Sequence, residues 1–145
     1  MVLRAPLWGS VVLLAALAAF ASPAEGQSAE VEDTLSVLDG VYTEEQAEKG
    51  EDIFQQECSA CHLPSEFSGP IFEVAWSDRP VYDLYRVTAI TMPQDRPGSL
   101  SEEEYAAVIA YILELNEYPA GEEKLGSEED PLGHILIEPA PDGSR

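Results

Sequence analysis

Apolar residues recur at helical spacing in three segments of the chain, and no segment alternates long enough to predict a sheet. The strongest pattern follows Ser101, which forms a capping box with Glu104 and opens a helix that should end near Asn116. The apolar residues of this segment form one stripe: Tyr105, Val108, Ile109, Ile112 and Leu115. The pattern therefore predicts a helix with one buried face.

Two further helices are predicted earlier in the chain. Thr43 and Gln46 form a second capping box, which opens a helix at about residues 44–57. Asp78 is a candidate N-cap for a middle helix that ends before Met92. Between these helices, Pro, Ser and Gly alternate with scattered aromatic residues, which is typical of a loop that wraps around something. Together these features predict an all-α fold with three main helices.

The first residues of the chain predict export. Residues 11–21 are apolar and uncharged, but they are fewer than the roughly 20 that a membrane span needs, and small residues follow them. We therefore expect residues 1–26 to be a signal peptide, cleaved between about residues 21 and 26, which leaves no stable membrane span. An uncleaved N-terminal anchor is the alternative.

Outside a predicted domain at residues 41–120, the chain is acidic and lacks a sustained hydrophobic period. We expect residues 27–40 to be a flexible leader and residues 121–145 to be an acidic tail rich in Pro and Gly. Within that tail, only Ile135–Ile137 could dock, as a short extended segment.

The charge of the chain limits its partners. Its 7 Lys and Arg are outnumbered by 28 Asp and Glu, so the formal net charge is −21. Such a polyanion is repelled by nucleic acid and by anionic membranes, and it is attracted to proteins with a basic docking face. Nucleic-acid binding is therefore excluded, although part of the charge serves solubility alone.

The two cysteines belong to one motif, Cys58-Ser59-Ala60-Cys61-His62. The C-x-x-C-H spacing is typical of c-type haem attachment, because two thiols can bind the haem edge while the adjacent His62 ligates the iron. A disulfide would close too short a loop to stabilise much. A redox dithiol should open a helix rather than follow one, and a zinc site lacks a second pair of ligands. The motif predicts one covalently attached haem c.

The second iron ligand decides what a haem can do. Met92 would be the single methionine left after signal cleavage, and it lies directly before Pro93 in a turn between predicted helices. A His and Met pair closes the iron to other ligands and suits electron transfer. The alternatives are a Met92 that only fills the core, and a second ligand at His134.

These residues resemble the small class I c-type cytochromes, especially the cytochrome domains that accompany bacterial quinoprotein dehydrogenases. The resemblance covers most of residues 41–125 and rests on the C-x-x-C-H run, on Met92-Pro93 and on the segment from Tyr105 to Gly121. It implies a cytochrome c fold, with three main helices and loops around one haem. It also implies a close crossing of the first and last helices, at Gly50 and Phe54 against Val108 and Tyr111.

The same resemblance implies further residues around the haem. A proline carbonyl would accept the proton of His62, with Pro70 as the candidate and Pro64 as the alternative. Trp76 would lie near the haem. Apart from the resemblance, Arg79 and Arg86 are rare cations in an acidic chain, and either could pair with a propionate. The connection from His62 to Phe72 is shorter than is usual in that family, which would expose one haem edge.

The functional prediction is a periplasmic mono-haem cytochrome that shuttles single electrons between a periplasmic dehydrogenase and a downstream cytochrome or oxidase. Such a protein is an electron carrier and not an enzyme in its own right. Two alternatives remain. The chain could be a stable cytochrome subunit of a dehydrogenase complex, or a haem protein with an open site, such as a peroxidase or gas binder.

Overall fold

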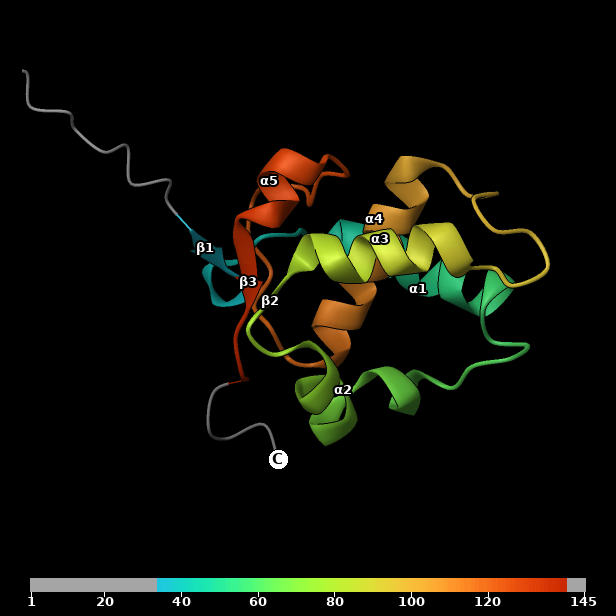
Figure 1. The fold of residues 1–145 in the computed structure, drawn as a ribbon, viewed down its shortest axis with the longest axis horizontal. Coiled ribbons are helices and arrows are strands. Elements are labelled where there is room, and N and C mark those ends of the chain that lie inside the picture. The colour runs from blue at the N-terminus through green and yellow to red at the C-terminus, as the bar shows by residue number, and fades with distance from the viewer. Residues whose placement is uncertain (1–33, 141–145) are drawn as a thin grey trace, which may run out of the picture. The chain divides into compact units, whose positions relative to one another are not determined.

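The computed structural model describes residues 34–140, so the predicted signal peptide at 1–26 and the first half of the predicted leader lie outside the described residues. The described part is mainly helical (Figure 1). Its α-helices are α1 (Glu44–Glu57), α2 (Gly69–Trp76), α3 (Val81–Thr91), α4 (Glu102–Leu115) and α5 (Glu129–Gly133). Its shorter elements are the strands β1 (Leu35–Ser36), β2 (Arg79–Pro80) and β3 (Ile135–Ile137), with the 3-10 helices η1 (Val37–Asp39) and η2 (Pro64–Phe67).

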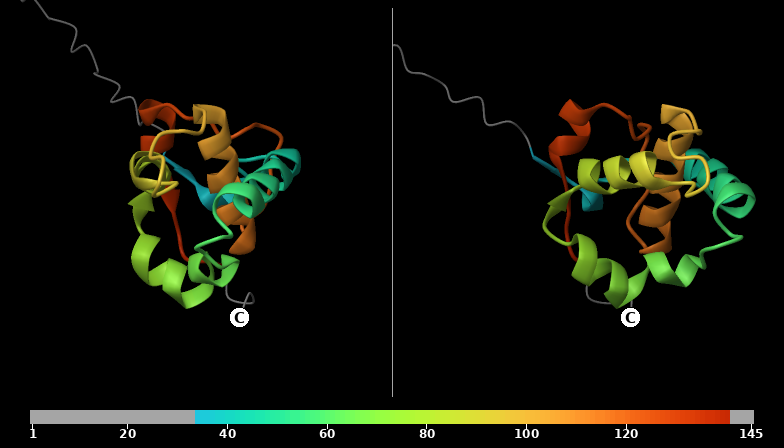
Figure 2. Two further views of the ribbon diagram at one scale, coloured as in Figure 1. Left: turned by 90° about the vertical axis from the view of Figure 1, so that its right-hand side faces the viewer. Right: turned by 45° about the vertical axis from the view of Figure 1, so that its right-hand side comes forward.

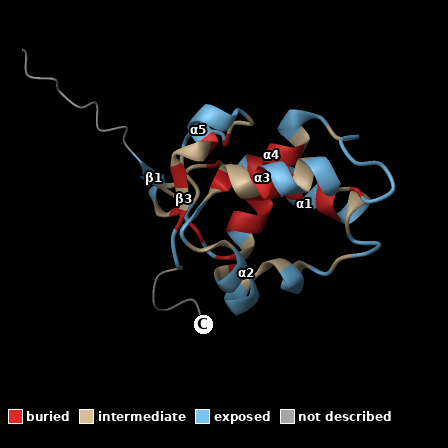
Figure 3. Ribbon diagram, in the orientation of Figure 1, coloured by how far each residue is buried: buried red, intermediate tan, exposed pale blue. Residues whose placement is uncertain are grey.

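The centre of the described part is α4, which packs against α1 and α3 (Figure 2). Most of its residues are buried, as the colouring in Figure 3 shows, whereas α1 and α3 each bury one face. The predicted apolar stripe on α4 is therefore only part of its buried surface. Burial on several sides is what a helix at the centre of a helical domain requires.

The crossing of α1 and α4 is as close as the resemblance implied. A Cβ added at Gly50 would overlap the backbone carbonyl of Ala107 and would crowd the side chain of Tyr111. The rings of Phe54 and Tyr111 lie with their centroids 5.5 Å apart. The nearest α4 residue to Gly50 is thus Ala107, one position before the expected Val108.

The predicted caps are present in part. Ser101 and Glu104 form the full capping box: the Ser101 hydroxyl accepts from the Glu104 amide, and the Glu104 carboxylate accepts from the Ser101 amide. At α1 the Thr43 hydroxyl accepts from the Gln46 amide at 3.2 Å, but the Gln46 side chain turns away. It bonds both the amide and the carbonyl of Leu125, each at 2.8 Å.

The stretch before α3 differs from the prediction in two ways. Residues 63–78 form η2 and α2 rather than a continuous loop, because the turn residues Pro64 and Pro70 each lie in the first turn of a helix. Asp78 does not cap α3, which begins at Val81. Its backbone is left-handed with φ of 62°, and its amide donates to the Ile137 carbonyl at 2.8 Å.

The C-terminal segment packs on the domain, within the range expected to be an acidic tail rich in Pro and Gly. The extended segment expected at Ile135–Ile137 is the strand β3, which pairs parallel with β1 and antiparallel with β2. Leu132 and Ile137 are fully buried. The end of the predicted leader is also ordered, because Val37 in η1 is fully buried. None of the helices in residues 34–140 has the length and apolar character that crossing a membrane requires.

Candidate functional site

A cavity of about 760 Å³ opens between α1, α3 and α4. Its size lies within the range of small-molecule and cofactor sites, and large apolar side chains form much of its wall. The residues that line it are Phe54, Gln56, Glu57, Cys58, Ala60, Cys61, His62, Phe67, Trp76, Leu84, Val87, Thr88, Thr91, Met92, Pro93, Gln94, Asp95, Arg96, Val108 and Ile112.

The C-x-x-C-H motif forms a turn at the C-terminal end of α1. Cys58 is the C-cap of that helix, and its carbonyl accepts from the amides of Cys61 and His62, each at 3.0 Å. This turn brings all three side chains to the wall of the cavity. Both cysteines are free thiols. Burial, with a smaller contribution from the Glu57 carboxylate, raises the pKa of the Cys58 thiol, whereas a redox dithiol needs a lowered one.

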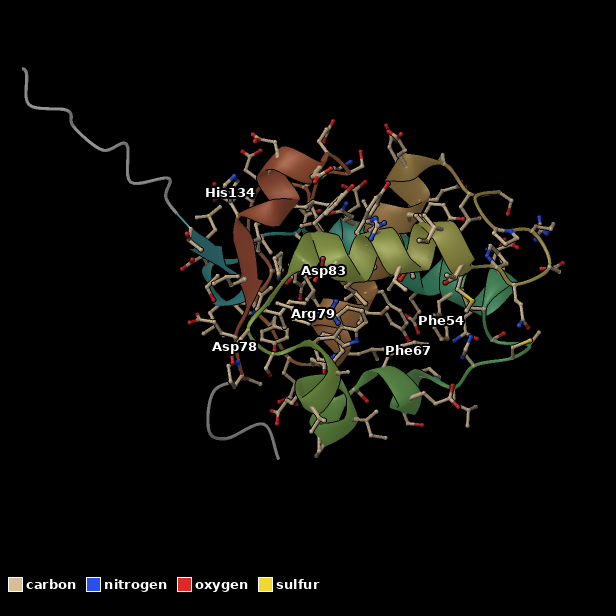
Figure 4. All side chains as sticks on the ribbon, viewed as in Figure 1. Phe54, Phe67, Asp78, Arg79, Asp83 and His134 are labelled. Carbon is tan, nitrogen blue, oxygen red and sulfur yellow. The ribbon has the colours of Figure 1, made fainter. Side chains whose placement is uncertain are left out.

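The imidazole of His62 is held from two sides. Its Nδ1 lies 3.1 Å from the Glu66 carboxylate, and its ring meets the edge of the Phe67 ring with centroids 5.3 Å apart. A carboxylate only accepts, so Nδ1 carries the proton and Nε2 is the nitrogen free to bind a metal. Phe67 in turn packs edge-on against Phe54, which joins this group to α1 (Figure 4).

Met92 lines the same cavity, although 29 residues separate it from His62 in the chain. It is the C-cap of α3, and its amide donates to the Thr88 carbonyl. The hydroxyl of Tyr105 on α4 donates to its carbonyl at 2.6 Å. Sequence reasoning had placed Tyr105 only in an apolar stripe, so its hydrogen bond to the Met92 carbonyl was missed.

The segment after His62 is fixed by a buried amide at the end of α4. Asn116 is 7% exposed, and its oxygen accepts from the Gly69 amide at 2.9 Å. Its nitrogen donates to the carbonyls of Phe67 and Ile112, each at 2.8 Å. Asn116 therefore ties the short connection between η2 and α2 to the helix that carries much of the cavity wall. The sequence had marked it only as a helix end.

The other residues expected around the haem differ in whether they line the cavity. Trp76 lines the cavity, whereas Pro70, Arg79 and Arg86 do not. The Arg79 guanidinium lies 4.6 Å from the centroid of the Trp76 ring, and it pairs with Asp83 on α3; Figure 4 labels both charged residues. Arg79 therefore contacts Trp76, a residue of the cavity wall, but does not line the cavity itself.

The basic side chain that lines the cavity is that of Arg96. Its guanidinium forms an ion pair with Glu57 and lies 3.6 Å from the Asp95 carboxylate. Sequence reasoning missed Arg96. The available clue was its position in the same Pro-rich turn as Met92, only a few residues after that ligand candidate.

His134 does not line the cavity. It follows α5 and lies beside β3, and its Nε2 is 3.9 Å from Asp130. Figure 4 shows it on the far side of the described part from Phe54 and Phe67. Within residues 34–140, no group of three or more His, Cys, Asp or Glu is arranged to hold a metal ion.

Residues 45–112 match the family model described as cytochrome C oxidase, cbb3-type, subunit III. They form a cytochrome c domain. The matched range runs from α1 into α4 and contains the C-x-x-C-H motif and Met92. No curated protein and no solved structure matches the chain. The prediction of a mainly helical cytochrome c fold is confirmed, and carrying electrons is the function typical of such a domain.

The residues present fit a c-type haem. The cavity of this cytochrome c domain combines two free thiols, an imidazole with Nε2 available, and a methionine thioether, within largely apolar walls. Cys58 and Cys61 would hold such a haem covalently, and His62 and Met92 would bind its iron. When bound, the haem supplies one-electron chemistry. The thiols, His62 and Met92 would hold it, and the apolar side chains of the cavity would pack against it.

Proposed function

We propose that this cytochrome c domain is a mono-haem electron carrier outside the cytoplasm, which passes single electrons from a periplasmic dehydrogenase to a downstream cytochrome or oxidase. The observation that carries the proposal is the placement of His62 and Met92 in one cavity with both thiols. A thioether on the second axial position closes the iron to oxygen and peroxide. This placement supports electron transfer over the open-site alternative.

The ligand set is tested by the spectrum of the protein expressed with haem-attachment machinery. We expect covalently bound haem, a low-spin iron in both oxidation states and the weak charge-transfer band of a methionine bound to ferric iron. Met92→Leu keeps the apolar wall but removes the thioether, so the band should disappear while the haem stays attached. His134→Gln is the matched control, because it removes the rival ligand, and its spectrum should equal that of the unmodified protein.

Two results would contradict this assignment. A chain without covalent haem would remove the basis of the proposal. A high-spin ferric iron in the unmodified protein would favour the open-site alternative and leave Met92 as a core residue.

The negative charge of the protein supports a redox partner with a basic docking face. On α1 the carboxylates Glu44, Glu45, Glu48, Glu51 and Asp52 are all exposed. Attraction between such a surface and a basic partner speeds encounter and weakens as salt screens it. We expect the rate of electron transfer to a basic redox protein to fall steeply with ionic strength, whereas the rate with an uncharged small oxidant should change little. Equal salt dependence for both would argue against docking through the acidic surface.

One observation favours the second candidate, a lasting subunit of a dehydrogenase complex. On α2, Ile71 and Val74 are 64% and 90% exposed. Exposed apolar side chains grouped on one helix are typical of an interface. A stable complex would survive high salt during purification, and the double variant Ile71→Ser, Val74→Ser would release the partner. A carrier that binds only transiently would show neither effect.

A further inference from the structure

Nδ1 of His62 lies within hydrogen-bond distance of the Glu66 carboxylate, at 3.1 Å. We propose that Glu66 is the residue that orients and polarises the proximal histidine, in the place that the resemblance assigned to a proline carbonyl, and that its negative charge lowers the reduction potential of the haem. The inference rests on the proposed function, since it requires haem on His62. Metal-bound histidines generally donate their second N–H to a carboxylate, a carbonyl or water, which fixes the ring and increases its basicity.

The chain holds the Glu66 carboxylate in position through its own local turn. Glu66 is the third residue of η2, and its Oε2 accepts from the Leu63 amide at 3.2 Å as well as facing His62 at 3.1 Å. The next residue, Phe67, packs on the His62 ring, and its carbonyl is bonded by the buried Asn116. The carboxylate is therefore fixed by a turn that α4 anchors.

The two proline candidates are placed for a different task. Pro64 is the first residue of η2, and Pro70 is the second residue of α2. In both positions the carbonyl points along its own helix, toward amides of the following turn. Glu66 is the acceptor that the structure places within hydrogen-bond distance of His62 Nδ1.

A charged acceptor has a redox consequence that a neutral one lacks. A carboxylate on Nδ1–H makes the imidazole a stronger donor, and this stabilises ferric iron, which carries more positive charge than ferrous iron. The Glu66 side chain is 52% exposed, so water screens part of this effect. The hydrogen bond itself is local and persists under screening.

Glu66→Gln tests the charge, because glutamine keeps the shape and an acceptor oxygen. We expect its haem to remain covalently attached and low-spin, with a reduction potential raised by about 59 mV, which is a tenfold change in the equilibrium of a one-electron couple. Asp95→Asn is the matched control: it removes one charge from the same cavity but has no contact with His62. It should shift the potential much less.

A second measurement needs no variant. In the reduced, diamagnetic protein, the Nδ1 proton of His62 should show a nuclear Overhauser contact to the Glu66 side chain, and Glu66→Gln should move its resonance upfield. The inference is overturned if the two variants shift the potential equally, if Glu66→Gln leaves it unchanged, or if the Nδ1 proton contacts a proline instead. Absence of covalent haem from the unmodified protein would instead refute the proposed function, so the two failures are distinguishable.

Discussion

Replacing Gly50 by Ala is expected to destabilise the protein, although the same change inside most helices is favourable. Alanine normally gains about 1 kcal/mol over glycine in a helix, because glycine loses more backbone entropy on folding. At Gly50 the new methyl group would overlap the Ala107 carbonyl and press on Tyr111. The obstacle is backbone, which cannot rotate away, so α1 must move off α4.

The size of the effect follows from these opposing contributions. Overpacking of a filled contact costs about 1–3 kcal/mol, and an overlap with backbone belongs at the upper end. Subtracting the gain in helix propensity leaves a net loss of about 2 kcal/mol. For a domain of this size, such a loss lowers the melting temperature by roughly 8 °C or more.

Thermal and urea unfolding of the haem-loaded protein, followed by far-UV circular dichroism, measures this loss. Gly133→Ala is the matched control, because Gly133 is the last residue of α5 and an added Cβ there meets no atom within 4 Å. The control should be as stable as the unmodified protein or slightly more so. If Gly50→Ala unfolds at or above the midpoint of that control, the close crossing of α1 and α4 does not limit stability.

Two further variants test the ligand loop and the acidic surface. Tyr105→Phe removes the hydroxyl that donates to the Met92 carbonyl, a loss of about 1 kcal/mol. Added imidazole should then displace Met92 from ferric iron about fivefold more readily. The control Tyr85→Phe should leave this imidazole titration unchanged. Burial raises the pKa of the Glu114 carboxyl, and the carboxylates of Glu51, Glu48 and Glu44 raise it further. Because the raised pKa disfavours the charged form in the folded state, stability at this site is present in acid and is lost as the pH rises through that pKa. Glu114→Gln should therefore stabilise the protein at neutral pH by about 0.3 kcal/mol, the scale of exposed charge pairs, and should make no difference in acid. Urea unfolding at both pH values measures this, and a Glu114→Gln protein less stable than the unmodified one at pH 7 would contradict the reasoning.

Local patterns in the sequence were sufficient for the main helices and for the haem motif. The capping box at Ser101 and the apolar spacing that follows it determine where α4 begins, because both depend on residues within one or two turns. The C-x-x-C-H spacing is equally local, since the chain itself sets how far apart the two thiols can lie. Met92 was identified for a related reason, by its place in a turn between two helices.

The residues that sequence reasoning missed, or placed wrongly, depend on partners far along the chain. Gln46 was assigned to a local cap, but its side chain bonds Leu125 across 79 positions. The segment at Ile135–Ile137 was expected to dock in an extended form, but nothing in the neighbouring sequence identified the two strands that it pairs with. It is ordered because β1 and β2 both supply backbone partners for it.

The sequence by itself determined the helices, the two thiols and both candidate axial ligands, because periodicity, capping and motif spacing act over a few residues. Only the tertiary structure decided what surrounds them. It selected Glu66 as the partner of His62, Arg96 as the cation at the cavity, and Asn116 as the anchor of the connecting segment. The physical reason is that such contacts depend on distances and directions in space, which many different residue spacings along a chain can satisfy equally well.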